Sequence, residues 1–368
     1  MKAIHGRVLV FLCLIAALGQ TAIGQTDSLL RIRRGGKYGF IDTHGRIVIP
    51  PKFYWAWAFE DGRALVYSCG KYGFIDAKGT FAVPARFDAA SMFFRNSLAG
   101  VQVGKHWGYI DKAGELVIPP RFDRVRDFSA DGLAPVEIEG KWGYIDKHGT
   151  FAIPAMFSGA GGFSEGMAPV QSEQGGQWGF IDEHGLYISQ ARFDAACEFS
   201  EQRACIERNG KWGYIDQSGK IVILPQFQLP AGDFSEGLAV VVVGYKYGFI
   251  NRTGKMVIAP RFDLAYSFSQ GVAVVSANRK TGFIDRLGRW VSPPHIGDLD
   301  FLDGGFVAVV DQTDGKTGDE WGYMRRDGRF IWRASIAEAP THEMWPVVGF
   351  EETQKQTEIQ KSCHVDPA

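Results

Sequence analysis

The stretch that decides the fold is Lys-Trp-Gly-Tyr-Ile-Asp-Lys-His-Gly-Thr-Phe-Ala-Ile-Pro-Ala-Met-Phe, residues 141–157. Its centre is an aromatic residue, a glycine, a second aromatic residue and isoleucine, and this unit returns nine times with the glycines 34–40 residues apart. Such regular self-similarity predicts a tandem-repeat protein in which each unit packs on its neighbours. The nine glycines are Gly39, Gly73, Gly108, Gly143, Gly179, Gly213, Gly248, Gly282 and Gly322.

Each unit is predicted to fold as a three-stranded antiparallel meander. In one copy, the strands are the apolar-rich runs at 133–138, 141–145 and 150–153, and Pro154 ends the third because it cannot donate to a β-ladder. The whole chain has 46 glycines and 13% aromatic residues, which is typical of short strands and tight turns. The sequence therefore predicts an all-β fold.

The turn between the second and third strands has a recurring chemistry. Aspartate stands at its first position and glycine at its fourth, as in Asp146-Lys147-His148-Gly149. We expect the aspartate to cap backbone N–H groups and the glycine to take a positive φ. The pairs are Asp42/Gly45, Asp76/Gly79, Asp111/Gly114, Asp146/Gly149, Asp182/Gly185, Asp216/Gly219 and Asp285/Gly288, while Asn251/Gly254 keeps the chemistry and Arg325/Gly328 does not.

The glycine between the two aromatic residues is expected to be a packing notch. Period-two alternation puts Trp142 and Tyr144 on one face of the strand and Gly143 and Ile145 on the other. A glycine in mid-strand weakens a sheet, so its presence in all nine units predicts that another segment lies against the bare backbone. We expect an aromatic ring of a neighbouring strand or unit to occupy this place.

The arrangement of the units is expected to be an open superhelical stack, with a propeller-like closed ring as the alternative. Propeller blades usually need about 40–45 residues, and propellers usually have about 4–8 blades. Nine units of this shorter length match neither value. The array is predicted to span 25–332, followed by a poorly ordered C-terminal tail at 333–368 whose composition is polar.

The N-terminal segment 1–24 is typical of a secretory signal peptide. Lys2 and Arg7 precede an apolar run at 8–19 that is too short to span a bilayer, and the small residues Ala22 and Gly24 predict cleavage after Gly24. The alternative is an uncleaved membrane anchor, and no later segment is apolar enough to span a membrane. The sequence thus predicts an exported protein, in the periplasm, on the outer surface or outside the cell.

Four cysteines follow this segment, and an exported protein could oxidise them. Their spacing matches no zinc pattern. Cys197 and Cys205 are the nearest pair, and they form either a disulfide or two small buried residues. The four are Cys69, Cys197, Cys205 and Cys363.

The repeat resembles the bacterial WG-repeat (KWG-type) family. The resemblance is carried by Lys141 to Gly149, by Ile153-Pro154 and by Phe163-Ser164-Glu165-Gly166, and it covers about residues 29–332. It implies β-repeat arrays in bacterial proteins, often exported, with no settled catalytic role and no functional residues to transfer. The chain departs from the pattern at Thr281, Met324 and Arg325, and degenerate terminal units fit a cap.

No catalytic, cofactor or metal site is predicted. Gly162 to Gly166 matches the G-x-S-x-G nucleophile elbow, but Ser164 belongs to a repeated loop and no strand-to-helix context is expected. The eight histidines do not cluster, and turn capping already accounts for aspartates that could bind calcium. With 40 Lys+Arg against 41 Asp+Glu, the charge balance does not suggest nucleic acid.

Candidate binding residues are those where the repeat is broken, because stacking does not dictate them. Trp55 and Trp57 replace a recurring Asp-x-Ala stretch, and 171–176 and 311–320 are longer, polar hairpin tips. The recurring Arg-Phe-Asp, as in 86–88, indicates either a ladder of ion pairs between units or a row that grips an anionic ligand. We expect a non-enzymatic module that binds a protein partner at the cell envelope. Glycan or cell-wall binding through Trp55 and Trp57 is the alternative, and an enzyme of unknown class is least favoured.

Overall fold

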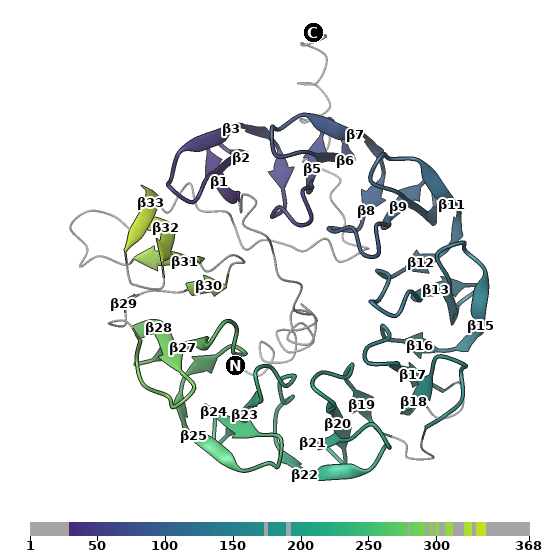
Figure 1. The fold of residues 1–368 in the computed structure, drawn as a ribbon, viewed down its shortest axis with the longest axis vertical. Coiled ribbons are helices and arrows are strands. Elements are labelled where there is room, and N and C mark those ends of the chain that lie inside the picture. Colours follow the sequence, from purple (N-terminus) through teal and green to yellow (C-terminus); the bar gives the residue numbers. More distant parts are fainter. Residues whose placement is uncertain are drawn as a thin grey trace, which may run out of the picture.

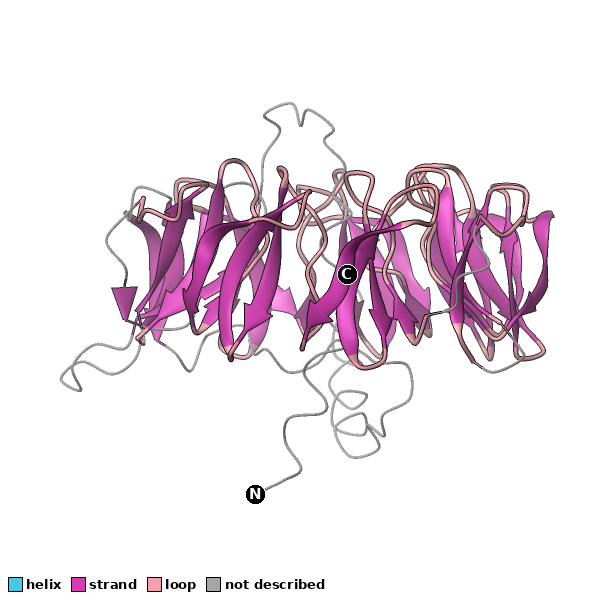
Figure 2. Ribbon diagram, turned by 90° about the horizontal axis from the view of Figure 1, so that it is seen from below, coloured by secondary structure: helices cyan, strands magenta, loops and turns pink. Residues whose placement is uncertain are grey.

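The computed structural model describes residues 29–172, 176–188, 193–278 and 280–291, and then the segments 295–296, 299–301, 306–311, 320–325 and 329–335. These residues form nine small antiparallel sheets and no helix. The sheets stand side by side around a central opening, like the blades of a propeller (Figure 1). Seen from the side, the ring is one sheet high, with loops on both faces (Figure 2). The predicted signal peptide and C-terminal tail lie outside the described residues, apart from 333–335.

The strands follow the chain from the inner to the outer side of each blade. Blades 1 to 3 contain β1 (Leu30–Arg34), β2 (Lys37–Ile41) and β3 (Ile47–Phe53); β4 (Trp55–Ala56), β5 (Ala64–Ser68), β6 (Lys71–Ile75) and β7 (Phe81–Phe87); and β8 (Ala89–Ala90), β9 (Ala99–Val103), β10 (His106–Ile110) and β11 (Leu116–Phe122). Blades 4 to 6 contain β12 (Arg124–Val125), β13 (Ala134–Ile138), β14 (Lys141–Ile145) and β15 (Phe151–Phe157); β16 (Gly159–Ala160), β17 (Met167–Gln171) and β18 (Trp178–Asp182); and β19 (Ala195–Ala196), β20 (Ala204–Arg208), β21 (Lys211–Ile215) and β22 (Ile221–Phe227). Blades 7 to 9 contain β23 (Leu238–Val243), β24 (Lys246–Asn251) and β25 (Met256–Phe262); β26 (Leu264–Ala265), β27 (Val272–Ala277), β28 (Lys280–Asp285) and β29 (His295–Ile296); and β30 (Leu299–Phe301), β31 (Phe306–Asp311), β32 (Glu320–Arg325) and β33 (Phe330–Ser335).

The predicted meander is confirmed, and most blades add a fourth strand on the inside. In blade 4, β13, β14 and β15 form the meander, and the two-residue strand β12 pairs with β13 through Arg124↔Glu137 and Val125↔Val136. A strand of two residues shows no period-two pattern, which is why the sequence did not reveal it.

The glycine notch is confirmed, but its occupant is not an aromatic ring. The outer strand β15 bulges where it passes Gly143, because Trp142 pairs with Phe157 while Tyr144 pairs with Ile153. A Cβ on Gly143 would lie 2.6 Å from the Ala155 nitrogen, so the backbone of the bulge fills the space of the missing side chain. The prediction of a packed ring was wrong because the bulge brings the neighbouring strand itself onto the glycine.

The capped turn is confirmed. In blade 4, Oδ1 of Asp146 accepts the N–H groups of His148 and Thr150, both at 2.9 Å, and Gly149 has a φ of +83°. This turn also touches the blade before it, because a Cβ on Gly149 would lie 3.0 Å from the Ile118 side chain, and the turn glycines of most other blades make the same contact. The turn glycine is therefore a second packing notch, this time between blades.

Tyrosine hydroxyls and aromatic pairs also join consecutive blades. The buried Tyr144 donates from Oη to the Gly161 carbonyl of the next blade at 2.9 Å, and its ring lies 4.7 Å from the Phe163 ring between centroids. Tyr109 and Tyr214 repeat the hydrogen bond at 2.8 and 2.6 Å. Burial of such rings between blades supplies much of the apolar area that a single unit could not bury alone.

The array closes into the ring that was named as the alternative, so the preferred open superhelical stack is not the arrangement formed. Leu30, Ile32 and Ile41 of blade 1 share one buried cluster with Tyr323 of blade 9, whose Oη donates to the Arg31 carbonyl. The turn glycine Gly45 meets the backbone of Ile331, as other turn glycines meet the blade before them. The short repeat length had argued against a propeller. A two-residue inner strand, however, allows a four-stranded blade to form from fewer residues than usual.

Candidate binding surface

The two faces of the ring carry different loops. Because strands alternate in direction, the capped Asp-x-x-Gly turns and the loops that follow the inner strands share one face, called here the turn face. The tips between the second and third strands of four-stranded blades, such as Glu139-Gly140, lie on the opposite hairpin face. A ligand could therefore meet either of two distinct surfaces.

On the turn face, the Phe-Ser-Glu-Gly loops form a chain of hydrogen bonds between blades. Glu165 and Gly166 both have positive φ values, +55° and +79°, as in a type I′ turn. Ser164 Oγ donates to the Phe199 carbonyl of the next blade at 2.6 Å, and Glu165 Oε2 accepts the Gln202 N–H at 2.8 Å. Ser164 thus lies in a β-turn and is hydrogen-bonded to a backbone carbonyl, and it does not form the strand-to-helix elbow of a nucleophile.

The Arg-Phe-Asp residues fit one of the two sequence interpretations in part and do not fit the other. Arg86 donates to the Gly114 carbonyl of the next capped turn at 2.6 Å, while Asp88 Oδ2 accepts the Gly104 N–H at 2.7 Å and so caps the hairpin tip of its own blade. The arginine and the aspartate thus have different partners on opposite faces of the ring. The arginine holds backbone and does not form a row that grips an anion. The aspartates also form ion pairs between units, but with lysines, because Asp88 pairs with Lys71 and Asp263 pairs with Lys246.

A two-residue position in each inner loop varies while the phenylalanine after it does not. In seven blades this phenylalanine packs against the second aromatic residue of the preceding unit, with ring centroids 4.7–5.2 Å apart. Each variable pair follows the inner strand or inner segment of its blade, and the inner strands border the central opening (Figure 1). The variable pairs are Trp57-Ala58, Met92-Phe93, Arg126-Asp127, Gly161-Gly162, Cys197-Glu198, Gly232-Asp233 and Tyr266-Ser267.

Two of these pairs bring carboxyl groups close together. Glu198 Oε1 accepts the Gly162 N–H at 2.6 Å, and burial raises the pKa of the Glu198 carboxyl. Burial, together with the nearby Glu198 charge, raises the pKa of Asp233 to about 7. The Asp233 carboxyl therefore changes its charge near neutral pH.

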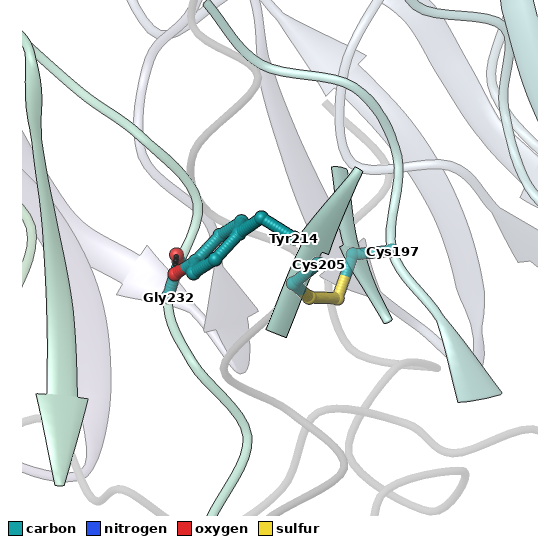
Figure 3. The surroundings of a disulfide bond; sticks show 4 residues. All are labelled: Cys197, Cys205, Tyr214 and Gly232. Carbon is teal, nitrogen blue, oxygen red and sulfur yellow. Dashed lines mark hydrogen bonds between the residues drawn. A yellow bond between two sulfur atoms is a disulfide. The ribbon is translucent and has the colours of Figure 1, made fainter. Parts of the chain in front are cut away.

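Cys197 and Cys205 form a disulfide, which resolves the two sequence alternatives. Their Cα atoms are 5.2 Å apart, and the bond joins the segment after β19 to β20, beside Tyr214 and Gly232 (Figure 3). Both sulfurs lie within 4.8 Å of an Asp233 oxygen. In the disulfide the sulfurs have no thiolate to offer a metal, so this group serves as a cross-link.

A shallow depression on the turn face is lined by charges that already have partners. Arg252 pairs with Glu201 at 2.9 Å, and Arg286 donates to the Glu236 carbonyl. The depression therefore offers little unsatisfied polarity to a ligand.

Trp55 and Trp57, the residues singled out from the sequence, are half-buried. They belong to a row of rings, with centroid distances of 5.0 Å from Tyr38 to Trp55, 6.0 Å from Trp55 to Trp57 and 5.9 Å from Trp57 to Tyr72. Neither tryptophan is fully exposed or fully buried, so exposure alone does not decide between protein and glycan binding. Of the two irregular hairpin tips, 173–175 and 312–319 lie outside the described residues.

Sequence reasoning missed the basic residues beside this row. Arg31 and Arg33 lie on β1, and their guanidinium carbons stand 5.5 and 5.9 Å from the centre of the Tyr38 ring. The available signal was alignment of the repeats, since the equivalent positions of other units carry apolar, small, neutral polar or acidic residues.

Comparison with known proteins identifies the repeat and the fold. A family described as "WG containing repeat" matches eight tandem segments, at 38–71, 72–105, 107–142, 142–174, 178–212, 212–247, 247–280 and 282–316. No curated protein matches the chain. Within the described residues, no helix has the length and apolar character that a membrane crossing requires.

Among solved structures, the chain is similar to a eukaryotic initiation factor, with 13% identity and a TM-score of 0.62 over 86% of this chain and 97% of that chain. It is also matched to the dihydro-heme d1 dehydrogenase NirN, with 14% identity and a TM-score of 0.46 over 75% and 74% of the two chains. Hsv2p of Kluyveromyces lactis matches with 10% identity and a TM-score of 0.41 over 75% and 96%. The likeness to the initiation factor is one of fold alone.

Proposed function

Because this chain belongs to the WG-containing repeat family, we propose that it is an exported, non-enzymatic module that binds a protein partner through the inner loops of the turn face. The repeated residues of the ring have structural roles, so we expect the residues that differ between repeats to bind the partner. The aspartates cap turns, the glycines admit neighbouring backbone, and the serine and glutamate of each loop hold the next blade.

One observation carries this proposal, namely that the pairs before the inner-loop phenylalanines differ in chemistry from blade to blade. The ring gathers seven such pairs on the inner side of one face, although they are far apart in the sequence. They combine aromatic, cationic, anionic and glycine residues, and this mixed chemistry suits a protein surface better than a small substrate.

Export is supported by the signal-like segment 1–24 and by the Cys197–Cys205 disulfide, since disulfides persist in oxidising compartments. The non-enzymatic part is supported by the hydrogen bonding of Ser164, whose hydroxyl holds a neighbouring loop. Cell fractionation with N-terminal sequencing tests export, and a secreted form beginning at Gln25 is expected.

Cross-linking of the tagged full-length protein in its native envelope, followed by mass spectrometry, tests the binding surface. Cross-links to one partner should concentrate on the inner loops of the turn face. Arg126→Glu should weaken recovery of that partner at least ten-fold, whereas Lys105→Glu, the same charge change on an exposed hairpin tip, should not. Equal recovery by both variants would contradict the proposed surface, and turnover of ester, peptide or glycosidic substrates would contradict the non-enzymatic role.

Glycan binding is kept as a second candidate function because the structure places Trp55 and Trp57 in one row of rings with Tyr38 and Tyr72. Rows of half-buried aromatic side chains can present apolar faces to sugar rings while their other sides anchor in the core.

A further inference from the structure

The first hairpin differs from the other units because it carries two arginines opposite its aromatic residues. The other blades form without cations at these positions. Arg33 lies opposite the first aromatic residue of its unit, where the other blades carry Tyr67, Gln102, Glu137, Gln171, Glu207, Val242, Ser276 and Val310. Arg31 lies opposite the second aromatic residue, where the others carry Leu65, Gly100, Pro135, Pro169, Cys205, Val240, Val274 and Ala308. Blade 1 alone has a cation at either position.

The cations of this hairpin also lack the carboxylate that accompanies other hairpins. Lys71 pairs with Asp88 at 2.5 Å, and Lys246 pairs with Asp263 in the same way. At the residue equivalent to Asp88, the first interface has Tyr54, and the Lys37 ammonium lies 2.9 Å from the centre of its ring. Within the described part of the chain, neither Lys37 nor any arginine of β1 makes an ion pair.

Three polar groups of the same cluster are buried and have no hydrogen-bond partner among the described residues. They are Arg33 Nε, Tyr38 Oη and Trp55 Nε1, and the Tyr38 side chain is 1% exposed. Arginine Nε and indole Nε1 can only donate, and a buried donor without a partner destabilises the fold. Polar pairing at this first interface is therefore incomplete among the described residues.

Aromatic rings lie directly beside these donors. The guanidinium groups of Arg31 and Arg33 lie over the Tyr38 ring, and the row continues with Trp55 of the inner strand β4 and with Trp57 just after that strand. Arg31 is held in this position because it donates to the Ala56 carbonyl at 2.8 Å. Cations, unpartnered donors and flat apolar rings thus meet at one place on the seam between blades 1 and 2.

We propose that this cluster, consisting of Arg31, Arg33, Lys37, Tyr38, Tyr54, Trp55 and Trp57, binds an acidic polysaccharide whose sugars carry carboxylates. The carboxylates pair with the guanidinium groups, and the sugar faces lie on the half-buried rings of Trp55 and Trp57. A nucleic acid also has anions and rings, but it needs cations that follow several phosphates, whereas here the unpaired cations belong to one hairpin. The inference deepens the second candidate function and is independent of the turn-face proposal.

Calorimetric titration of the full-length protein with an oligogalacturonate tests the site. Binding is expected for this acidic oligosaccharide and should be at least ten-fold weaker for a neutral xylo-oligosaccharide, for polyglutamate and for single-stranded DNA. Two variants introduce residues that other units already carry at these positions, namely Arg33→Glu, as at Glu137, and Tyr54→Asp, as at Asp88. Each should weaken oligogalacturonate binding at least ten-fold at an unchanged melting temperature, whereas Lys105→Glu should leave it unchanged.

The outcomes separate the proposals. Oligogalacturonate binding that survives both variants would leave glycan binding standing and overturn this site. Equally strong binding of polyglutamate or DNA would overturn the assignment of the ligand as a carbohydrate, since the positive charge alone would then explain binding. Absence of oligogalacturonate binding would overturn the inference altogether, while the cross-linking result on the turn face would be unaffected.

Discussion

Blade 4 and blade 1 are built by the same devices and differ in how their charges are used. In blade 4, Glu137 lies opposite Trp142 and pairs with Arg124 of the inner strand, with Nε and Oε2 2.7 Å apart. In blade 1, Arg33 takes the place of that glutamate and makes no ion pair among the described residues. The notch glycine and the capped turn are the same in both. The comparison teaches that folding dictates the glycines and turns, while the residues opposite the aromatic pair can change chemistry without changing the blade.

The largest effect should come from the notch glycine, and it should be equal in both blades. In Gly143→Ala the new Cβ would lie 2.6 Å from the Ala155 nitrogen, and in Gly39→Ala it would lie 2.5 Å from the Ile49 carbonyl oxygen. Since the obstacle is backbone, each variant should lose about 3 kcal/mol of unfolding free energy. Urea denaturation measures this loss, and a loss below about 1 kcal/mol in blade 1 alone would break the equivalence of the two blades.

The next effect concerns the half-buried Asp233 carboxyl of blade 7, which lies outside the two blades compared. With a folded pKa of about 7 against 3.8 for the free carboxyl, Asp233 binds more protons in the folded state than in the unfolded state between these values. Stability should therefore fall as pH rises through this window and stay low above about pH 7. Asp233→Asn should gain about 2 kcal/mol near pH 8, half the full linkage value because the carboxyl is only partly buried, and almost nothing below about pH 4.

Thermal melts across this pH range provide the measurement for Asp233. Glu139→Gln, at an exposed hairpin tip of blade 4, is the matched control and should change stability equally little at every pH. A gain for Asp233→Asn that is independent of pH would contradict titration of this carboxyl.

A smaller effect is expected from the capped turn. Asp146→Ala removes the acceptor of two backbone N–H groups and should cost about 1 kcal/mol. Asp146→Asn should be close to neutral, because Asn251 makes the same two bonds at 3.0 Å in blade 7. Chemical denaturation distinguishes the two substitutions, and equal losses would show that capping is not the role of the side chain.

The smallest effect on stability should be that of Arg33→Glu. This variant gives blade 1 the residue that blade 4 carries, and the arginine has no ion pair to lose among the residues that the structure describes. Its unfolding free energy should stay within about 0.5 kcal/mol of the original protein. A loss above about 2 kcal/mol would mean that the cations of blade 1 stabilise the fold. Blades 1 and 4 would then differ in stability and not only in surface charge.

Much of the blade could be predicted from residues that recur. Gly143 in mid-strand indicated a close approach, and Asp146 with Gly149 indicated a capped turn, because both depend on contacts within one unit. The partners of Arg86 and Asp88 could not be predicted in the same way. Residues two apart in an extended segment lie on the same face, so the sequence suggested a shared role for Arg86 and Asp88. The bulge and the next blade decide which backbone groups each side chain reaches.

The candidate binding residues were predicted only in part. Trp55 and Trp57 stood out because they break the repeat, whereas Arg31 and Arg33 did not, since their meaning depends on the strand register that places them opposite aromatic residues. The variable pairs of the inner loops were likewise invisible as a group, because only the ring brings residues from different units to one opening.

The sequence by itself determined the β-blade, its length and its turns, because glycine, aspartate and proline act on local backbone conformation. The tertiary structure alone decided that nine blades close on themselves, with Tyr323 bonded to the Arg31 carbonyl and Gly45 against Ile331. Closure depends on the angle between neighbouring blades summed around the whole array. That angle is set by packing between units, and no single repeat records it.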